Sequence, residues 1–306
     1  MGTIVVLYSL RFYVCIPTGE ILWIFSYMAT VQKFSQKKGS FYMSVIRVGV
    51  VGATGKMGRE ILKAVTNDEA TDVIFGVGLV DEPTTLTVEG KEIPVYGTLK
   101  EAFEKHSVDT IIDFTNAAAF RENAPIALAQ GVNLVTGTTG LDHSEIEAFG
   151  KVAEEKGKCL FYAANYAIGA VLMMEFAEQA AKFMPEVEII EFHHDQKKDA
   201  PSGTAVATAR KIATVRAAHE QGLLGEIETL DGARGANFEG MHIHSVRMPG
   251  YNAHQEVIFG GLGQTLTIRH DSINRESFMP GIVYATKETF GMVGLVEGLD
   301  TLMFEK

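Results

Sequence analysis

The sequence has little cysteine and little proline. Two of its 306 residues are cysteine and eight are proline. Cys15 and Cys159 cannot supply a disulfide framework, and the lack of a CxxC pair argues against structural zinc. The 31 glycines follow no repeating period, which excludes collagen-like chains and repeat arrays. This composition fits a reducing compartment, and we expect the protein to be cytoplasmic.

An excess of positive charge is also missing. The formal net charge of −11 at pH 7 argues against general binding to nucleic acid or anionic membranes. It leaves room for a local basic pocket that binds a small anion. Hydrophobic residues make up 46% of the chain and charged residues 21%, which excludes a mostly disordered protein. The length favours two domains.

No long uninterrupted apolar run is present. A membrane-spanning helix needs about 20 apolar residues, but Arg11, Pro17, Gly19 and Glu20 interrupt the apolar and aromatic residues 1–31. Signal-peptide and transit-peptide patterns are not evident either. We therefore predict no stable membrane association. Residues 1–43 are interpreted as an extension outside the fold or a mis-assigned start, and a membrane-associated leader is the alternative.

A glycine-rich turn follows the first predicted strand. Val45–Val51 is a short apolar run typical of a buried parallel strand, and the sequence GATGKMG leads from it into a helical pattern. Glycines at 52, 55 and 58 permit a tight turn over which a diphosphate can bind the free amides of the helix start. We predict that a dinucleotide contacts Gly52, Ala53, Thr54, Gly55, Lys56 and Met57. A tight turn without a ligand is the alternative.

The next predicted strand, residues 73–80, ends at Asp81. A carboxylate at this place accepts hydrogen bonds from the adenosine ribose and repels the additional phosphate of NADP. No Arg or Lys lies between Val73 and Gly90. These features favour NADH over NADPH. Lys56, in the glycine-rich turn, could still bind the additional phosphate of NADPH. An ordinary solvated loop acid is the alternative for Asp81.

Further strands alternate with helices up to residue 166. Strands are predicted at 108–113, 132–136 and 158–162, with helices at 117–130 and 144–156. This alternation predicts an α/β fold with a Rossmann-like, doubly wound parallel sheet. Ligands bind such sheets at the carboxyl ends of the strands. The residues predicted there to line the nicotinamide half of a cofactor are Phe114, Gly137, Thr138, Thr139, Ala163, Ala164, Asn165 and Tyr166.

Residues 191–205, EFHHDQKKDAPSGTA, follow a predicted strand at 187–192. His193 and His194 can supply a proton or bind a carboxylate, and Lys197 offers a positive charge. Ser202, Gly203 and Thr204 precede a helical pattern at 205–213, where hydroxyl and amide groups can bind an anion. Each of these features alone is common on protein surfaces. Their concentration within a dozen residues predicts a catalytic segment.

The chain resembles the dihydrodipicolinate reductase family. The resemblance covers residues 45–306 and lies in residues 51–58, 137–140, 163–166, 191–205, 244–250, 254–260 and 266–272, and in Arg275. It implies reduction of a cyclic, unsaturated imine dicarboxylate by NADH or NADPH in lysine biosynthesis. By this resemblance His193 and Lys197 are catalytic, and His194, Ser202, Gly203 and Thr204 bind the dicarboxylate. Arg275 matches a family arginine near the cofactor.

The resemblance also implies an assembly and a division into domains. Residues 44–166 and 276–306 are expected to form the dinucleotide-binding domain. Residues 167–275, with predicted strands at 187–192, 241–247, 253–260 and 264–271, are expected to form a smaller α+β domain. Its mixed sheet would bind substrate and assemble a homotetramer.

Other functions stay open. Two histidines on one face of a strand, His242 and His244, suggest a metal hydrolase, which leaves the glycine turn unexplained; we predict no metal. A dinucleotide-binding sensor without catalysis is a second alternative. A related dehydrogenase of the aspartate pathway is a third, but an aspartate-semialdehyde type needs a nucleophilic cysteine, and Cys159 lies within a predicted strand.

Overall fold

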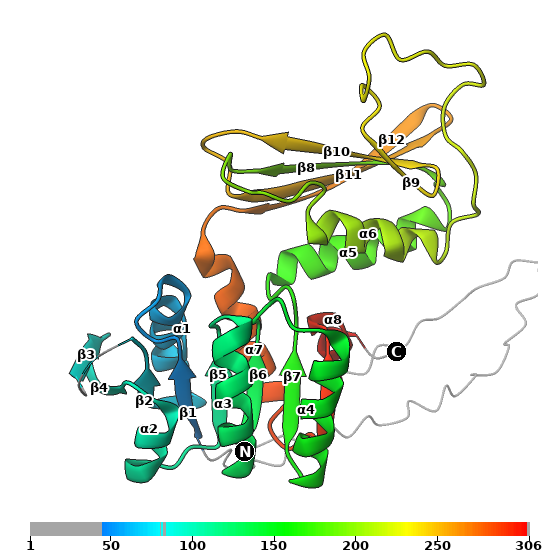
Figure 1. The fold of residues 1–306 in the computed structure, drawn as a ribbon. Helices are drawn as coiled ribbons and strands as arrows, with labels where there is room; N and C mark the ends of the chain where they lie inside the picture. Colours follow the sequence, from blue (N-terminus) through cyan, green and yellow to red (C-terminus); the bar gives the residue numbers. More distant parts are fainter. Residues whose placement is uncertain (1–44, 80, 82–83, 305–306) are drawn as a thin grey trace, which may run out of the picture. The chain divides into compact units, whose positions relative to one another are not determined.

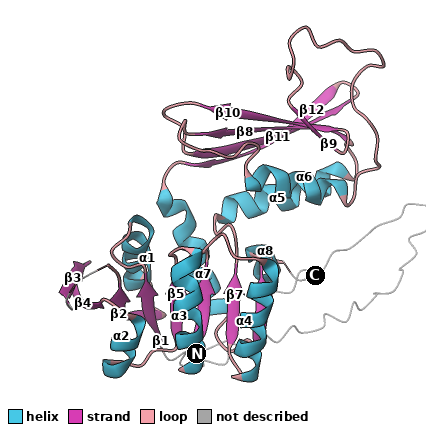
Figure 2. Ribbon diagram, in the orientation of Figure 1, coloured by secondary structure: helices cyan, strands magenta, loops and turns pink. Residues whose placement is uncertain are grey.

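The computed structural model describes residues 45–79, 81 and 84–304. The expectations for residues 1–43 therefore fall outside the described part of the chain. Residues Met43–Lys306 form a single compact unit. Its strands belong to two sheets (Figures 1 and 2), an eight-stranded large sheet and a five-stranded small sheet. Within the described ranges, no helix is both long and apolar enough to cross a membrane.

The large sheet has the strand order β13-β7-β6-β5-β1-β2-β4-β3. All its neighbouring strands pair in parallel except β3 and β4. Its central strands are almost continuously buried because helices cover both faces. The strands are β1 (Ile46–Val51), β2 (Thr71–Val77), β3 (Thr84–Val88), β4 (Lys91–Tyr96), β5 (Thr110–Asp113), β6 (Asn133–Thr136), β7 (Cys159–Tyr162) and β13 (Gly294–Glu297).

Two separate apolar cores account for the two covered faces. One core combines α1 (Lys56–Asn67), α7 (Met279–Glu288) and α8 (Leu299–Met303) with one side of the sheet. The other combines α2 (Leu99–Lys105), α3 (Ala117–Ala129) and α4 (His143–Glu155) with the opposite side. The predicted doubly wound parallel sheet is therefore confirmed, and the predicted strands and helices agree with the structure to within a few residues.

Four elements in or next to the large sheet have no counterpart among the predicted ones. They are the hairpin strands β3 and β4, the short helix α2, and the strand β13, which the final segment of the chain supplies parallel to β7. Gly90, with φ +79°, allows the tight hairpin turn.

The small sheet has the order β12-β11-β8-β10-β9. Its strands are β8 (Glu186–His193), β9 (Ala236–Phe238), β10 (Met241–Arg247), β11 (Ala253–Gly261) and β12 (Gln264–Ser272). β8 and β10 are parallel and the other pairs antiparallel, so the predicted mixed sheet is confirmed. Helices α5 (Ile168–Ala181) and α6 (Gly203–Ala213) pack their buried residues against one face (Figure 1).

Strand alternation fixes which side chains of β8 reach these helices. Val187, Ile189, Glu191 and His193 fall on the helix-covered face because side chains two residues apart share a face. Glu188 falls on the opposite face. This register places a carboxylate and an imidazole next to the start of α6.

Candidate active site

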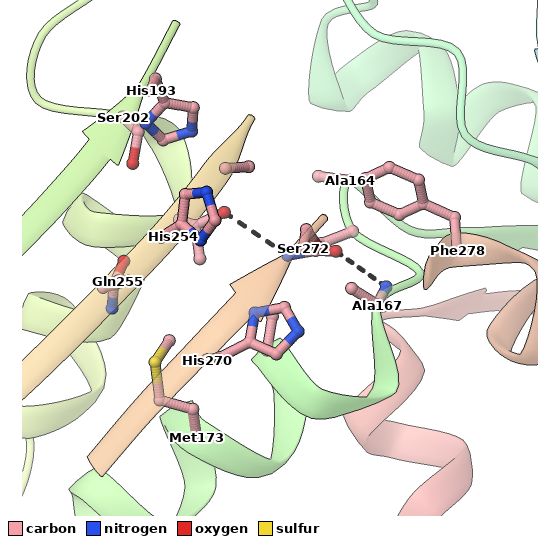
Figure 3. A pocket seen from close by; sticks show the side chains of 14 residues that line it. Ala164, Ala167, Met173, His193, Ser202, His254, Gln255, His270, Ser272 and Phe278 are labelled. Atoms are coloured by element: carbon pink, nitrogen blue, oxygen red, sulfur yellow. Dashed lines mark hydrogen bonds between the residues drawn. The ribbon is translucent and has the colours of Figure 1, made fainter. Parts of the chain in front are cut away.

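A pocket lies between the residues that follow β7 and the end of the small sheet nearest the start of α6 (Figure 3). Its lining includes main-chain and side-chain atoms from the end of the large sheet, from α5, from the 3₁₀ turn η1 (Arg275–Phe278) and from β8, β11 and β12. The polar members are Asn165, His193, Ser202, Thr204, His254, Gln255, His270 and Ser272.

Two helices begin at this pocket. Ser202 caps α6, and its hydroxyl accepts a hydrogen bond from the amide of Ala205 at 3.2 Å. At the start of α5, the Asn165 carbonyl oxygen accepts from the amide of Ala167 at 2.9 Å, while its NH₂ group donates to the Thr204 hydroxyl at 3.4 Å (Figure 3). The positive ends of two helix dipoles therefore point toward one cavity, which favours a bound anion.

His193 reaches the pocket from the last residue of β8. Its Nδ1 lies 2.5 Å from Oε2 of Glu191, whose side chain is completely buried. Burial by itself raises the pKa of Glu191, but hydrogen bonds from His193 and Arg247 outweigh it and lower that pKa to about 2. Glu191 is therefore an ionised acceptor, and Nδ1 of His193 carries the hydrogen. This leaves Nε2 as the nitrogen for chemistry.

The other predicted side chains of the segment lie differently. The Lys197 ammonium pairs with Asp199 at 2.8 Å and is only 21% exposed, and His194 is exposed to solvent. Neither belongs to the pocket lining, and nor does Gly203. The structure thus brings His193, Ser202 and Thr204 together and leaves His194 and Lys197 beside the pocket rather than in it.

The glycine turn 52–58 has a backbone geometry that depends on its glycines. Gly52 has φ +84°, and a Cβ added to Gly58 would lie 2.1 Å from the carbonyl oxygen of Gly52. Gly55 is the N-cap of α1, where no side chain makes a capping hydrogen bond. The side chain of Ala53 is buried, and the Thr54 hydroxyl accepts from the amide of Leu79 at 3.3 Å. Main-chain amides are thus left to meet an anion.

Lys56 and Met57 extend this turn into α1. Lys56 is the first residue of α1 and is exposed. Met57 packs against the core beside α1. The predicted contribution of this turn to cofactor binding rests mainly on backbone shape rather than on side-chain chemistry.

Several residues at the strand ends hold one another in place. A Cβ at Gly137 would lie 2.3 Å from the ring of Phe114, and this ring packs on Tyr166 with centroids 5.1 Å apart. The Tyr166 hydroxyl donates to the carbonyl oxygen of Thr136 at 2.8 Å. Burial raises the pKa of Tyr166 well above its ordinary value. This phenol therefore stays neutral and has a structural role.

Thr138 has a similar role next to the buried Asp113. Its hydroxyl donates to Asp113 at 3.1 Å, and burial raises the pKa of that carboxyl group while the hydrogen bonds from Thr115 and Thr138 oppose the rise. Ala163 is buried as well. Among the predicted strand-end residues, Thr139 and Ala164 are the exposed ones, and Ala164 and Asn165 line the pocket.

Comparison with known proteins identifies the family. Residues 46–166 match the model of the dihydrodipicolinate reductase N-terminus, and residues 169–302 match the model of its C-terminus. The chain belongs to the dihydrodipicolinate reductase family. It is 48% identical over 263 residues to the 4-hydroxy-tetrahydrodipicolinate reductase of Halalkalibacterium halodurans, covering 85% of this chain and 100% of that protein. A similar relative from Streptococcus uberis is 48% identical over 258 residues, covering 84% of this chain and 99% of the relative.

A solved structure agrees with this assignment. Dihydrodipicolinate reductase from Paenisporosarcina sp. TG-14, solved with dipicolinate bound, matches with a TM-score of 0.75 at 43% identity. The match covers 84% of this chain and 99% of that one. An amine dehydrogenase from Mycobacterium smegmatis, 13% identical with a TM-score of 0.57 over 84% of this chain and 96% of that chain, shares the fold alone.

Of the predicted cofactor residues, only Ala164 and Asn165 line the pocket. Asp81 is exposed just beyond β2. Arg275 is exposed at the start of η1, a turn that contacts α1. Phe278, at the end of the same turn, lines the pocket.

The sequence did not predict several polar groups of the reductase pocket. His254 pairs with Asp271 at 2.6 Å, and burial lowers the pKa of His270. Glu191 and Arg247 lie in motifs that carry the family resemblance, but no role followed from their positions. The available signal was the spacing of Glu191 and His193, two residues apart on a strand.

The metal alternative finds no support in the geometry. Nε2 of His244 donates to Oε2 of Glu188 at 2.7 Å, on the face of the small sheet away from α5 and α6. No group of three or more His, Cys, Asp or Glu arranged to hold a metal occurs in the part of the chain that the structure describes.

Proposed function

We propose that the chain is a 4-hydroxy-tetrahydrodipicolinate reductase in the diaminopimelate route to lysine. The cyclic 4-hydroxy imine dicarboxylate loses water and gains a hydride from NADH or NADPH and a proton, which gives tetrahydrodipicolinate. Family membership carries this proposal. The pocket supports it because His193 and the starts of two helices surround one cavity. The Paenisporosarcina relative was solved with dipicolinate, a flat dicarboxylate that fits the same chemistry.

The glycine turn and the strand ends would hold the dinucleotide. Gly52–Met57 would bind the diphosphate through main-chain amides, and Phe114, Gly137–Thr139 and Ala163–Tyr166 would shape the nicotinamide site. When bound, the reduced nicotinamide supplies the hydride. Tyr166 and Thr138 contribute by fixing the loops, since their polar groups already bond within the protein.

The start of α6 would bind a substrate carboxylate. Gly203 and Thr204 would offer main-chain amides and Ser202 and Thr204 hydroxyls at a helix N-terminus, where a negative charge is stabilised. His194, exposed beside this turn, would contact a carboxylate from the solvent side. The arrangement explains how a protein of net charge −11 can bind a dianion.

Proton transfer falls to His193 and Lys197. Hydride addition to an unsaturated imine places negative charge on the ring nitrogen, and a nearby cation or proton donor lowers the barrier. His193 already faces the cavity (Figure 3). Lys197 reaches the ring nitrogen only when its ion pair with Asp199 opens, so loop 194–199 would rearrange when substrate binds.

NADH is the favoured cofactor. Asp81 would accept hydrogen bonds from ribose hydroxyls, and its charge would repel the phosphate of NADPH. The absence of Arg and Lys between Val73 and Gly90 removes the usual partners of that phosphate. Arg275, near α1, would contact the cofactor from the other side.

We also propose how the chain divides into domains and how it assembles. Residues 44–166 with 276–306 would bind cofactor, and 167–275 would bind substrate and assemble a cytoplasmic homotetramer through the small sheet. Exposed Leu223, Leu224 and Ile227 before β9 support burial against another copy. Light scattering during size-exclusion chromatography should give the mass of four chains.

A coupled assay tests the reductase. The substrate is generated from pyruvate and aspartate semialdehyde by the preceding synthase, and nicotinamide absorbance is followed with NADH and with NADPH. We expect substrate-dependent oxidation, faster with NADH. Tight NADH binding without oxidation would instead indicate a sensor. An aspartate-semialdehyde type of dehydrogenase is disfavoured because burial raises the pKa of Cys159 to about 12, which keeps its thiol protonated.

Adjacent lysines provide a matched pair of variants for the same assay. Lys197→Ala should lower kcat by about 100-fold, at the lower end of what proton transfer contributes, and leave NADH affinity unchanged. Lys198→Ala removes an equal charge from an exposed neighbour and should behave as the unaltered enzyme. Equal kcat values for the two variants would remove Lys197 from the mechanism.

A further inference from the structure

A buried carboxylate joins the catalytic strand to the anion-binding turn. Glu191 is 0% exposed. Its Oε2 meets Nδ1 of His193 at 2.5 Å and Nη1 of Arg247 at 2.8 Å. Its Oε1 accepts from Nη2 of Arg247 at 2.7 Å and from the amide of Ser202 at 3.1 Å. One side chain thus contacts the imidazole and the cap residue of α6 at once.

Arg247 extends this arrangement to the intervening loop. The same Nη2 that meets Glu191 also donates to the carbonyl oxygen of Asp199 at 2.7 Å. Asp199 in turn pairs with Lys197. The segment between His193 and Ser202 is therefore fastened to the sheet through the Glu191–Arg247 pair, which makes two parallel hydrogen bonds of the strong, charge-assisted kind.

We infer that Glu191 is a positioning residue of the reductase: it fixes the Nδ1–H tautomer of His193, turning Nε2 to the substrate, and holds the start of α6 at the distance that the dicarboxylate requires. This inference rests on the proposed function for its kinetic part. Its structural part, the tautomer, holds or fails independently of any activity.

The geometry predicts what an isosteric change does. In Glu191→Gln one oxygen becomes an NH₂ group. With the NH₂ group toward Ser202, it would face two donors, the Ser202 amide and Nη2 of Arg247. With the NH₂ group toward His193, it faces one donor, Nη1 of Arg247, and can donate to Nδ1. The second orientation is preferred, and it moves the imidazole hydrogen from Nδ1 to Nε2.

The opposite face of the same strand offers a matched control. Glu188 also binds a histidine and an arginine, with His244 Nε2 at 2.7 Å and Arg234 Nη2 at 2.7 Å. These residues do not line the pocket. Glu188→Gln therefore makes the same chemical change in an equivalent trio that contacts no part of the proposed site.

The experiment combines kinetics with ¹⁵N solid-state NMR of histidine-labelled protein, with His193→Asn used to assign the His193 signals. We expect Glu191→Gln to lower kcat by at least about 100-fold, to leave the Kd for NADH unchanged, and to convert neutral His193 from Nδ1–H to Nε2–H. Glu188→Gln should keep the kcat and the His193 signals of the unaltered enzyme.

Two results overturn the inference. One is a kcat for Glu191→Gln equal to that of Glu188→Gln. The other is an Nε2–H tautomer of neutral His193 in the unaltered protein, a measurement that does not depend on Glu191→Gln folding and uses His193→Asn only to assign the signals. If the unaltered protein fails to oxidise NADH with substrate, the proposed function fails, while the tautomer measurement still decides whether Glu191 fixes His193.

Discussion

The glycine turn and the pocket wall around Glu191, the two sides of the proposed site, depend on different physical features. The glycine turn 52–58 is defined by backbone shape: Gly52 has a positive φ, Gly58 lies where a Cβ cannot fit, and the side chains of Ala53 and Thr54 face the protein. The pocket wall around Glu191 is defined by charge, with a buried carboxylate, a guanidinium and an imidazole in contact. The glycine turn should therefore tolerate changes in side-chain charge but not in side-chain volume. The wall around Glu191 should tolerate changes in volume better than changes in charge.

The largest effect is expected on the charged side. His193→Ala should lower kcat about 1,000-fold, within the range that general acid–base catalysis contributes, because it removes the one imidazole held by Glu191. The Kd for NADH, measured by fluorescence titration, should not change. His244→Ala is the control, since His244 has a carboxylate partner but lies outside the pocket. If His193→Ala and His244→Ala have similar kcat values, His193 has no special part in catalysis.

Low pH should reduce the stability that ionised Glu191 contributes to the folded protein. The pKa of Glu191 falls from its ordinary 4.5 to about 2 in the folded protein, so ionised Glu191 stabilises the fold above about pH 4.5. That contribution, about 3 kcal/mol, is lost as the pH falls from 4.5 toward 2. In urea unfolding, the stability difference between the unaltered protein and Glu191→Gln should narrow steadily below pH 5. A difference that stays constant down to pH 3 argues against an ionised, paired Glu191.

Volume should matter most on the glycine side. Gly58→Ala forces a methyl group to within 2.1 Å of the Gly52 carbonyl oxygen, which should cost about 1–3 kcal/mol and weaken NADH binding about tenfold. Gly260→Ala is the control, because its methyl group would meet only Glu186 at 3.8 Å. Calorimetry of NADH binding gives both affinities. Equal affinities for the two variants would mean that the turn does not hold the diphosphate.

The smallest expected effect concerns cofactor choice. Asp81 is exposed, and an exposed charge contributes about 1 kcal/mol or less. Asp81→Ser should therefore raise the ratio of NADPH to NADH efficiency by no more than about fivefold. The ratio of kcat/KM values measures this. An unchanged ratio places the ribose elsewhere and leaves Asp81 as a solvated loop residue.

The sequence predicted the backbone-defined side better than the charged side. β-branched runs and glycine spacing are local signals, so β1, the turn at 52–58 and most strands and helices were predicted to within a few residues. The hairpin β3–β4 was missed because its strands are short and alternate with threonine and charged residues at the edge of the sheet. Its pairing depends on neighbours rather than on a buried apolar run.

The charged side depends on contacts between distant positions. His193, Ser202 and Thr204 were predicted from one segment, and the structure places them together at the pocket. Glu191 and Arg247 meet across 56 positions because β8 and β10 are parallel neighbours, a pairing that no local pattern specifies. Lys197 shows the converse: it is close to His193 in sequence, but its ion pair with Asp199 holds it beside the cavity.

A crystal structure with both NADH and dipicolinate tests the central claim most directly. The account predicts a dipicolinate carboxylate on the amides of Gly203 and Thr204, the ring beside Nε2 of His193, and the nicotinamide facing that ring from the Ala164–Asn165 side. Dipicolinate bound away from His193, or a nicotinamide turned from the pocket, would contradict it.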